Sequence, residues 1–132
     1  MNVRDLDHLT ITVSNLDRTM RFYHEVLDLP VVSFTKKLLT IQLGHQKLEF
    51  RQAGQQYQPN LAKPTPGASA FCITAKDSLT YTKEHLANYG VTIVAGPTKV
   101  KGPNGPMRAI YIYDPDRNLI EIKEAKQTNS PN

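Results

Sequence analysis

The chain has 132 residues, of which 39% are hydrophobic, and a formal net charge of +4. This length suits one domain with a buried core, and no apolar run reaches the ~18 residues of a membrane-spanning helix. The basic residues are scattered, so we expect no nucleic-acid binding, and the excess of positive charge favours an anionic substrate. The single Cys72 excludes an internal disulfide, and the polar N-terminus resembles no signal peptide, so we expect a cytoplasmic protein that does not contact membranes.

The opening stretch changes its apolar spacing at Ser14. Apolar and polar residues alternate over residues 8–13, which predicts a half-buried strand with His8 on its polar face. Beyond it, apolar residues recur at helical spacing and predict a helix over residues 16–27. Ser14 and Asp17 stand three apart at the junction, which is typical of a capping box.

Three further β-prone runs complete the first half of the chain, at residues 31–34, 38–43 and 47–52. In the last run Glu49 and Arg51 alternate with Leu48 and Phe50, so the two charged residues share a face. Residues 54–67 are rich in Gln, Pro and Gly and show no period, which predicts a connecting loop that closes over a site or wraps the other half.

The second half repeats this order. A strand is predicted over residues 68–75, followed by a helix that Asp77 or Ser78 caps and Gly90 ends. The remaining predicted elements are strands at 91–95, 107–113 and 119–123, a Gly/Pro/Lys loop at 96–106 and a polar, frayed tail at 126–132.

The two halves can be superposed strand on strand. This alignment places His8 over Ala70 and Leu16 over Ser78, and it puts Glu49 and Glu121 each on the last strand of a half. We therefore predict one α+β domain over residues 1–132, built from two β-α-β-β-β modules (about 5–53 and 68–124) that form a curved mixed sheet around a cleft. The sequence leaves open whether the modules pair within one chain or between chains.

The motifs of both modules resemble the vicinal oxygen chelate superfamily, which includes glyoxalase I, fosfomycin-resistance enzymes, extradiol dioxygenases and bleomycin-binding proteins. The resemblance rests on Asp7-His8-Leu9, on residues 14–18 with Phe22-Tyr23, and on residues 113–122. Residues 51–75 resemble a subgroup of glyoxalase-domain and virulence-associated proteins. The resemblance implies a small-molecule substrate or ligand and a homodimer.

The superfamily usually has glycine in its last turn, where this chain has Arg117. If that position needs a positive φ, Arg117 is strained by about 1 kcal/mol. Alternatively, Asn118 takes the left-handed conformation.

The resemblance also implies a metal site. Its metal-dependent members use a histidine on the first strand of each module and a glutamate on the last. The matching residues are His8, Glu49 and Glu121, whereas the second histidine position falls on Ala70. One imidazole with two carboxylates suits Zn, Ni, Mn, Fe or Co. Such a metal polarises vicinal oxygens, and a ligand that detaches, Glu49 or Glu121, moves a proton.

We assign three further residues to the substrate pocket, Arg51, Cys72 and Tyr111. Arg51 would pair with an anionic group and Tyr111 would form a wall, although both could simply fill a core or cover a sheet. Cys72 is a candidate substitute ligand, although a lone cysteine more often serves as a small apolar residue. Likewise, His8 could be a structural residue and Glu49 a surface charge.

Two functions remain open on the sequence alone. The first is a glyoxalase-like, divalent-metal-dependent lyase or isomerase acting on a small oxygen-rich molecule, favoured by His8, Glu49 and Glu121. The second is a metal-free protein that sequesters a small molecule, as bleomycin-resistance proteins do, and Ala70 favours it. An extradiol dioxygenase ranks third because its two-histidine site is incomplete here.

Overall fold

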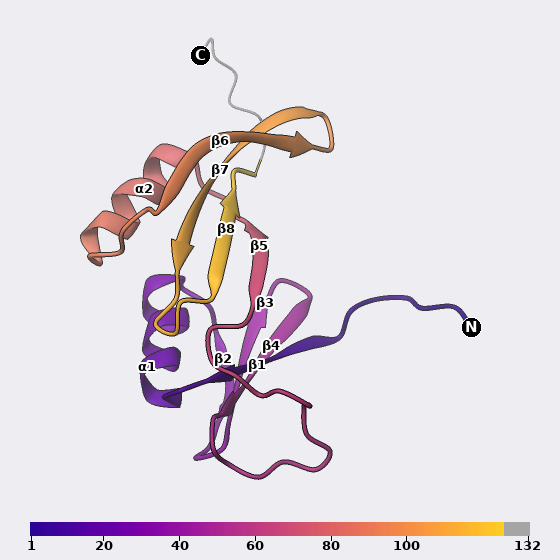
Figure 1. The fold of residues 1–132 in the computed structure, drawn as a ribbon. Coiled ribbons are helices and arrows are strands. Elements are labelled where there is room, and N and C mark those ends of the chain that lie inside the picture. The colour runs from indigo at the N-terminus through magenta and orange to yellow at the C-terminus, as the bar shows by residue number, and fades with distance from the viewer. Residues whose placement is uncertain (126–132) are drawn as a thin grey trace. The chain divides into compact units, whose positions relative to one another are not determined.

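The computed structural model describes residues 1–125, and the predicted tail at 126–132 lies outside them. The chain forms two compact units, the first from residues 1–69 with 115–117 and the second from residues 70–114 with 118 onward. Each unit contains one four-stranded mixed sheet (Figure 1). Over residues 1–125, no helix has the length and apolar character needed to cross a bilayer.

The first unit has the predicted order of elements. They are β1 (His8–Val13), α1 (Leu16–Arg21), the π-helix η1 (Phe22–Val26), β2 (Val31–Phe34), β3 (Leu38–Leu43) and β4 (Gln46–Gln52). The sheet order is β1-β4-β3-β2, with β1 parallel to β4 and the other neighbours antiparallel. β4 is therefore a central strand, and its side chains are flanked by β1 and β3.

The single helix predicted over residues 16–27 is an α-helical segment followed by a π-helical one. The predicted cap at Ser14 is wrong, because the N-cap is Asn15, whose side-chain oxygen accepts a hydrogen bond from the Arg18 amide at 2.9 Å. The Ser14 hydroxyl instead donates to the carboxylate of Asp116. A charged acceptor competes successfully for that hydroxyl and leaves the neighbouring Asn15 to cap the helix.

The core of the first unit lies between the helical segment and one face of the sheet. Tyr23 is fully buried, and its ring centroid lies 4.7 Å from that of Phe50 on β4 and 5.2 Å from that of Phe22. Ile11 on β1 is buried on the same side. Because strand side chains alternate, the residues between these apolar positions face away from the helix.

The second unit repeats the fold with β5 (Ala70–Thr74), α2 (Leu79–Asn88), β6 (Ala95–Gly102), β7 (Gly105–Tyr113) and β8 (Leu119–Lys123). The sheet order is β5-β8-β7-β6, and β5 is parallel to β8. Ser78 caps α2 by accepting a hydrogen bond from the Tyr81 amide, and Gly90 follows the helix with φ +72°. The cap and the glycine stop agree with the sequence prediction.

One prediction for the second unit is wrong. Residues 96–106 are not a long loop, since β6 extends to Gly102 and pairs with β7 from Gly105 after a two-residue turn. Residues 91–94 are not a strand. Gly96 has φ +91°, and a Cβ there would lie 2.6 Å from the Ala109 carbonyl oxygen. The register shifts between Ala95 and Thr98, so a bulge absorbs the Gly-Pro pair that suggested a loop.

The strand registers confirm the internal repeat. His8 pairs with Lys47, and Ala70, the first residue of β5, pairs with Leu119 at the corresponding place. The predicted alignment of Leu16 with Ser78 is off by one residue. Leu16 and Leu79 are both first helical residues, and Ser78 is a cap.

The turn between β7 and β8 decides the question of positive φ. Arg117 has φ +67°. The alternative at Asn118 is wrong, because this fully buried residue donates to the Asp114 carboxylate from its backbone amide at 2.9 Å and from its side chain at 2.8 Å. These two bonds fix the Asn118 conformation and leave the left-handed residue at Arg117.

Candidate functional site

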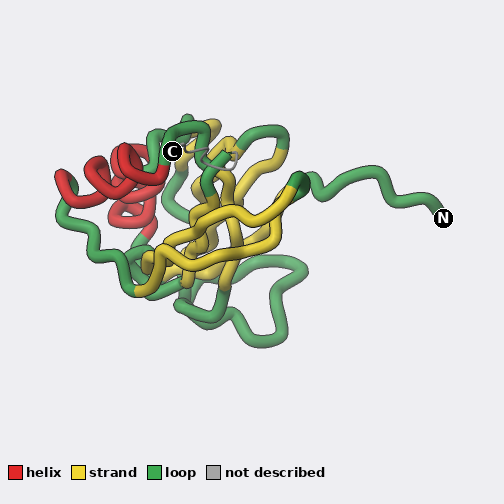
Figure 2. The backbone as a smooth tube through the Cα atoms, turned by 90° about the horizontal axis from the view of Figure 1, so that it is seen from above, coloured by secondary structure: helices red, strands yellow, loops and turns green. Residues whose placement is uncertain are grey.

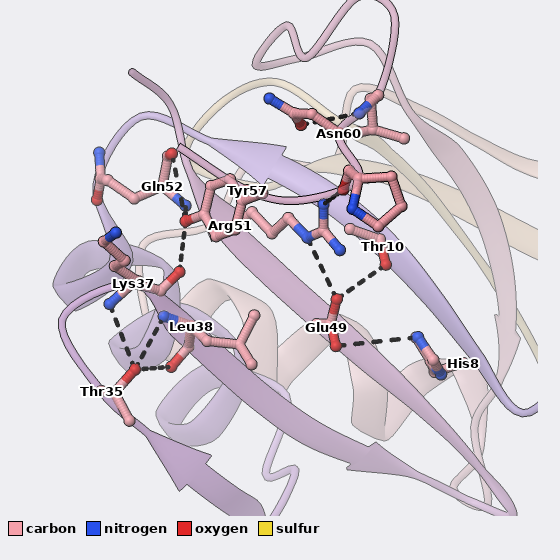
Figure 3. A network of polar contacts seen from close by, with 12 residues as sticks. His8, Thr10, Thr35, Lys37, Leu38, Glu49, Arg51, Gln52, Tyr57 and Asn60 are labelled. Atoms are coloured by element: carbon pink, nitrogen blue, oxygen red, sulfur yellow. Dashed lines mark hydrogen bonds and ion pairs between the residues drawn. The ribbon is translucent and has the colours of Figure 1, made fainter. Parts of the chain in front are cut away.

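The candidate site in the first unit is centred on Glu49 of β4. The Thr10 hydroxyl donates to Glu49 Oε1 at 3.1 Å, and Arg51 Nε lies 3.4 Å from the same oxygen. His8 Nε2 lies 3.9 Å from Glu49 Oε2 (Figure 3). The Glu49 side chain is only 19% exposed, so these neighbours supply interactions that water would otherwise provide.

His8 is held in this orientation from its other ring nitrogen. Nδ1 lies 2.9 Å from Asp7 Oδ1, and this hydrogen bond, with help from the charge of Lys47, lowers the pKa of Asp7. A carboxylate on Nδ1 favours the tautomer whose free lone pair is on Nε2, the nitrogen that faces Glu49. Metal-binding histidines commonly have such a partner on the second ring nitrogen.

The His8–Glu49 pair suits two ligands of one divalent metal. Bonds of about 2.1 Å at octahedral or tetrahedral angles separate two ligand atoms by about 3.0 to 3.4 Å. The observed 3.9 Å needs only a small side-chain movement to reach that separation. Within residues 1–125, no three His, Cys, Asp or Glu side chains gather closely enough for a complete metal site. The first unit therefore brings together two candidate ligands, His8 and Glu49.

The second unit brings together another set of predicted residues. On β8, Glu121 is paired in register with Cys72 of β5 and Tyr111 of β7, so the three lie on one rung of the sheet. Cys72 is exposed as a residue. Partial burial of its thiol, followed by the nearby charge of Glu121, raises the pKa of Cys72. The structure thus groups His8, Glu49 and Arg51 in the first unit and the other predicted residues in the second.

Three contributors to the first-unit site were missed by the sequence reasoning. Thr10 and Asp7 flank His8, and the shared face of Thr10 with His8 was a usable signal. Tyr57 lies in the segment between β4 and β5, which is loop throughout (Figure 2). Its ring centroid lies 4.8 Å from the Arg51 guanidinium, and its hydroxyl accepts from the Gln52 amide at 2.8 Å. No pattern in that segment marked Tyr57.

A hollow of about 480 Å³ lies in the first unit, away from Glu49, between the start of α1 and the turn that joins β2 to β3. It is lined by Ser14, Asn15, Leu16, Asp17, Phe34, Thr35, Lys36 and Gln52. The described contacts of His8 and Glu49 are with Asp7, Thr10 and Arg51, and none of these residues lines this hollow. The volume of this hollow is therefore no reason to place the candidate site there rather than at His8 and Glu49.

The sequence profile of the Glyoxalase/Bleomycin resistance protein/Dioxygenase superfamily matches residues 5–122. The chain belongs to this superfamily. Members often use divalent metals, and they bind small molecules. The repeated four-stranded sheet agrees with this assignment.

Relatives of the chain fall in the subgroup that the sequence suggested. It is 38% identical over 122 residues to the glyoxalase domain-containing protein RDO1 of Mycosarcoma maydis, covering 92% of this chain and 69% of that protein. It is 36% identical to the virulence protein STM3117 of Salmonella typhimurium, covering 94% and 86%. The crystal structure of STM3117 superposes with a TM-score of 0.86 over 96% of this chain and 100% of that one.

More distant superfamily proteins carry names that differ in function. The chain is 28% identical to the fosfomycin resistance protein FosX of Listeria innocua, covering 91% of this chain and 89% of that one. Lactoylglutathione lyase of Agrobacterium tumefaciens (22% identity, TM-score 0.73, 93% and 95% covered) and the antibiotic-binding protein TnmS3 of a Streptomyces species (16%, 0.76, 96% and 99%) share the fold. At these identities the structural likeness establishes the fold alone.

Proposed function

We propose that this protein is a glyoxalase-like lyase or isomerase that depends on a divalent metal and acts on a small oxygen-rich molecule. The proposed ligands are His8, Glu49 and Glu121. The observation that carries the proposal is the His8–Glu49 pair, with Nε2 facing the carboxylate at 3.9 Å and Nδ1 held by Asp7. Metal-binding histidines commonly have a carboxylate on the second ring nitrogen, as His8 has in Asp7.

The residues around the pair have distinct parts in this chemistry. A divalent ion (Zn, Ni, Mn, Fe or Co) held by His8, Glu49 and Glu121 would supply polarisation of two neighbouring substrate oxygens. Glu49 or Glu121 takes a proton from the carbon next to these oxygens and returns it to the adjacent atom. Thr10, which donates to Glu49 Oε1, directs the other oxygen toward His8. Arg51 binds an anionic group, and Cys72 and Tyr111 line the pocket.

Ala70 supports a second function, a metal-free protein that sequesters a small molecule. Ala70 begins β5 where His8 begins β1, so the second module lacks the matching imidazole. TnmS3, which shares the fold, is named as an antibiotic-binding protein. On this alternative, His8 and Glu49 form only an ion pair that shapes the pocket wall.

Metal content separates the two functions. The protein is purified without a histidine tag, and bound metals are measured for the wild type and for His8→Ala, Glu49→Gln and Glu121→Gln. We expect the three variants to bind metal at least about tenfold more weakly, as loss of a ligand or its support generally causes. His45→Ala, at an exposed turn, is the matched control and should match the wild type.

An absence of specific metal, or the same occupancy in all variants, would overturn the enzyme proposal and favour sequestration. A hemithioacetal isomerisation assay and ligand-induced shifts in melting temperature then address the substrate. We also propose a homodimer, which sedimentation analysis tests directly.

A further inference from the structure

A small hollow lies in the first unit beneath residues 53–64, which we term the covering segment. Thr12 and Arg51 line it from the sheet, and Tyr57, Asn60 and Pro64 line it from the covering segment. Its volume is about 10 Å³, close to the minimum that one water molecule requires. Both Thr12 and Arg51 belong to the same rung of the sheet, where β1 pairs with β4.

Thr12 has a buried hydroxyl with no hydrogen-bond partner among residues 1–125. The residue is 5% exposed, and Oγ1 itself is inaccessible to solvent. Thr10, one position earlier on the same face, donates to Glu49 and is satisfied. Because burial of an unpaired hydroxyl is unfavourable, a hydrogen bond from a water molecule or a ligand atom in the hollow would stabilise the Thr12 hydroxyl.

Arg51 lines the same hollow as Thr12 and has more N–H donors than its described hydrogen bonds use. Its described hydrogen bonds are those from Nε to Glu49 Oε1 and from Nη1 to the Pro59 carbonyl, both at 3.4 Å, the long end of the range. A guanidinium has five N–H donors in one plane. The Tyr57 ring covers one face of the guanidinium at 4.8 Å (Figure 3), and the remaining N–H donors lie in the guanidinium plane.

We propose that this hollow is a subsite for the carboxylate of a small ligand, held by the Arg51 guanidinium and the Thr12 hydroxyl. A planar carboxylate matches the planar fork of arginine and accepts two parallel hydrogen bonds. In its present shape the hollow has room for one carboxylate oxygen. The second carboxylate oxygen takes the place of the Pro59 carbonyl as acceptor for Arg51 Nη1, which requires the covering segment to move outward. Phosphate, with oxygens in three dimensions, fits this space less well.

This subsite deepens the proposed function by naming a chemical group of the ligand. It rests on that function only for the placement of the rest of the ligand near His8 and Glu49. Glu49 competes with the ligand for Arg51. Any change that removes the negative charge of Glu49 therefore strengthens carboxylate binding. Carboxylate binding itself needs no metal and can be measured whether or not a metal site exists.

The test uses the metal-free protein and isothermal titration with sodium acetate, at an ionic strength held constant with sodium chloride. We expect acetate to bind the wild type, and Thr12→Val and Arg51→Gln each to weaken it about tenfold, the effect of losing one charge-assisted hydrogen bond. Thr12→Val keeps the side-chain shape and removes only the hydroxyl. Arg21→Gln, at an exposed helical position, removes the same charge elsewhere and should leave binding unchanged.

Glu49→Gln provides the opposite change and should bind acetate more tightly than the wild type does. The subsite is overturned if acetate binds neither the wild type nor Glu49→Gln, or if Thr12→Val binds it as well as its parent. Equal weakening in Arg21→Gln would show a general charge effect and overturn it too. Tighter binding of inorganic phosphate than of acetate would overturn the assignment to a carboxylate.

Discussion

Each sheet has a glutamate at the corresponding position of its last strand, and the two glutamates have different neighbours. In the first sheet Glu49 pairs in register with Thr10 and Thr40, and in the second Glu121 pairs with Cys72 and Tyr111. The backbone pairing is the same in both. The repeat therefore fixes where a glutamate stands, and the neighbouring strands decide what that glutamate can contact.

The positions two residues before and after these rungs, on the same face of each sheet, differ in charge as well. The first module has His8 and Arg51 on either side of its glutamate, where the second has Ala70 and Lys123. Lys123 Nζ donates to the Lys101 carbonyl at 3.3 Å and so is directed to β6. At this place in the sheet, the described residues of the first copy form the ion pairs His8–Glu49 and Arg51–Glu49. The variants below are designed to remove or strengthen this asymmetry.

We expect the largest loss of stability from substitutions in the hydrophobic cores of the two units. Tyr23 and Leu86 each lie seven residues after the first helical residue of their module, and both are fully buried. We expect Tyr23→Ala to cost about 3–5 kcal/mol of unfolding free energy and Leu86→Ala about 2–5 kcal/mol. Tyr81→Ala, at an exposed position of α2, is the control.

Urea denaturation followed by circular dichroism measures these costs. One shared transition for both variants means that the two units unfold together. A variant that shifts only part of the signal would show that they unfold separately.

The next largest effect concerns the missing histidine. Ala70→His gives the second module the residue that His8 supplies in the first, and on the superfamily pattern it adds a fourth ligand. We expect metal affinity to rise at least about tenfold. Competition with a chromogenic chelator measures it, and Thr74→His, on the same strand, is the control. An unchanged affinity in Ala70→His would contradict the proposed ligand set.

The turns of the two modules test backbone strain. Gly44, between β3 and β4, has φ +59° with open space where a Cβ would lie, whereas Arg117 adopts φ +67° in the turn between β7 and β8. We expect Gly44→Ala to cost about 1 kcal/mol, purely from the backbone. Arg117→Gly should gain less than about 1 kcal/mol, since glycine also raises the entropy of the unfolded chain.

Denaturation midpoints measure both changes. A marked loss of stability in Arg117→Gly would mean that contacts of the arginine side chain outweigh its backbone strain.

The smallest expected effect concerns Cys72, whose counterpart in the first module is Thr10. Burial, and secondarily Glu121, raises the pKa of Cys72, so little thiolate is present at neutral pH and alkylation by iodoacetamide is slow. In metal-free protein, Glu121→Gln should lower this pKa and speed alkylation at a given pH. The rate should stay below that of a free cysteine, because burial remains. A slower reaction would contradict this electrostatic account.

Local sequence patterns predicted much of the fold. The strands at 31–34, 38–43 and 119–123 have the predicted bounds, since each is a short apolar run between turn residues. β6 was missed because Gly96 and Pro97 are usual loop residues, and only pairing with β7 shows that they form a bulge. Local signals do not report such long-range pairing.

The candidate site was partly accessible in the same way. Shared parity on one strand predicted that Glu49 and Arg51 face the same side, and their 3.4 Å contact agrees. Tyr57 could not be predicted, because its position over Arg51 depends on how an aperiodic segment returns to the sheet. Nor does the sequence give the unsatisfied hydroxyl of Thr12, which depends on what that segment covers.

The position of Asp116 determines whether the chain can be divided into two independent halves. It lies between two strands of the second sheet, yet it belongs to the first compact unit, where it accepts hydrogen bonds from the Ser14 hydroxyl and from Arg18 at 3.4 Å. A split between Ser69 and Ala70 would leave the Asp116 carboxylate on the other fragment. Separately expressed halves would each be incomplete, and their complementation should weaken when Asp116 is replaced by alanine. The duplication is visible in the topology, but the present-day halves are no longer interchangeable parts.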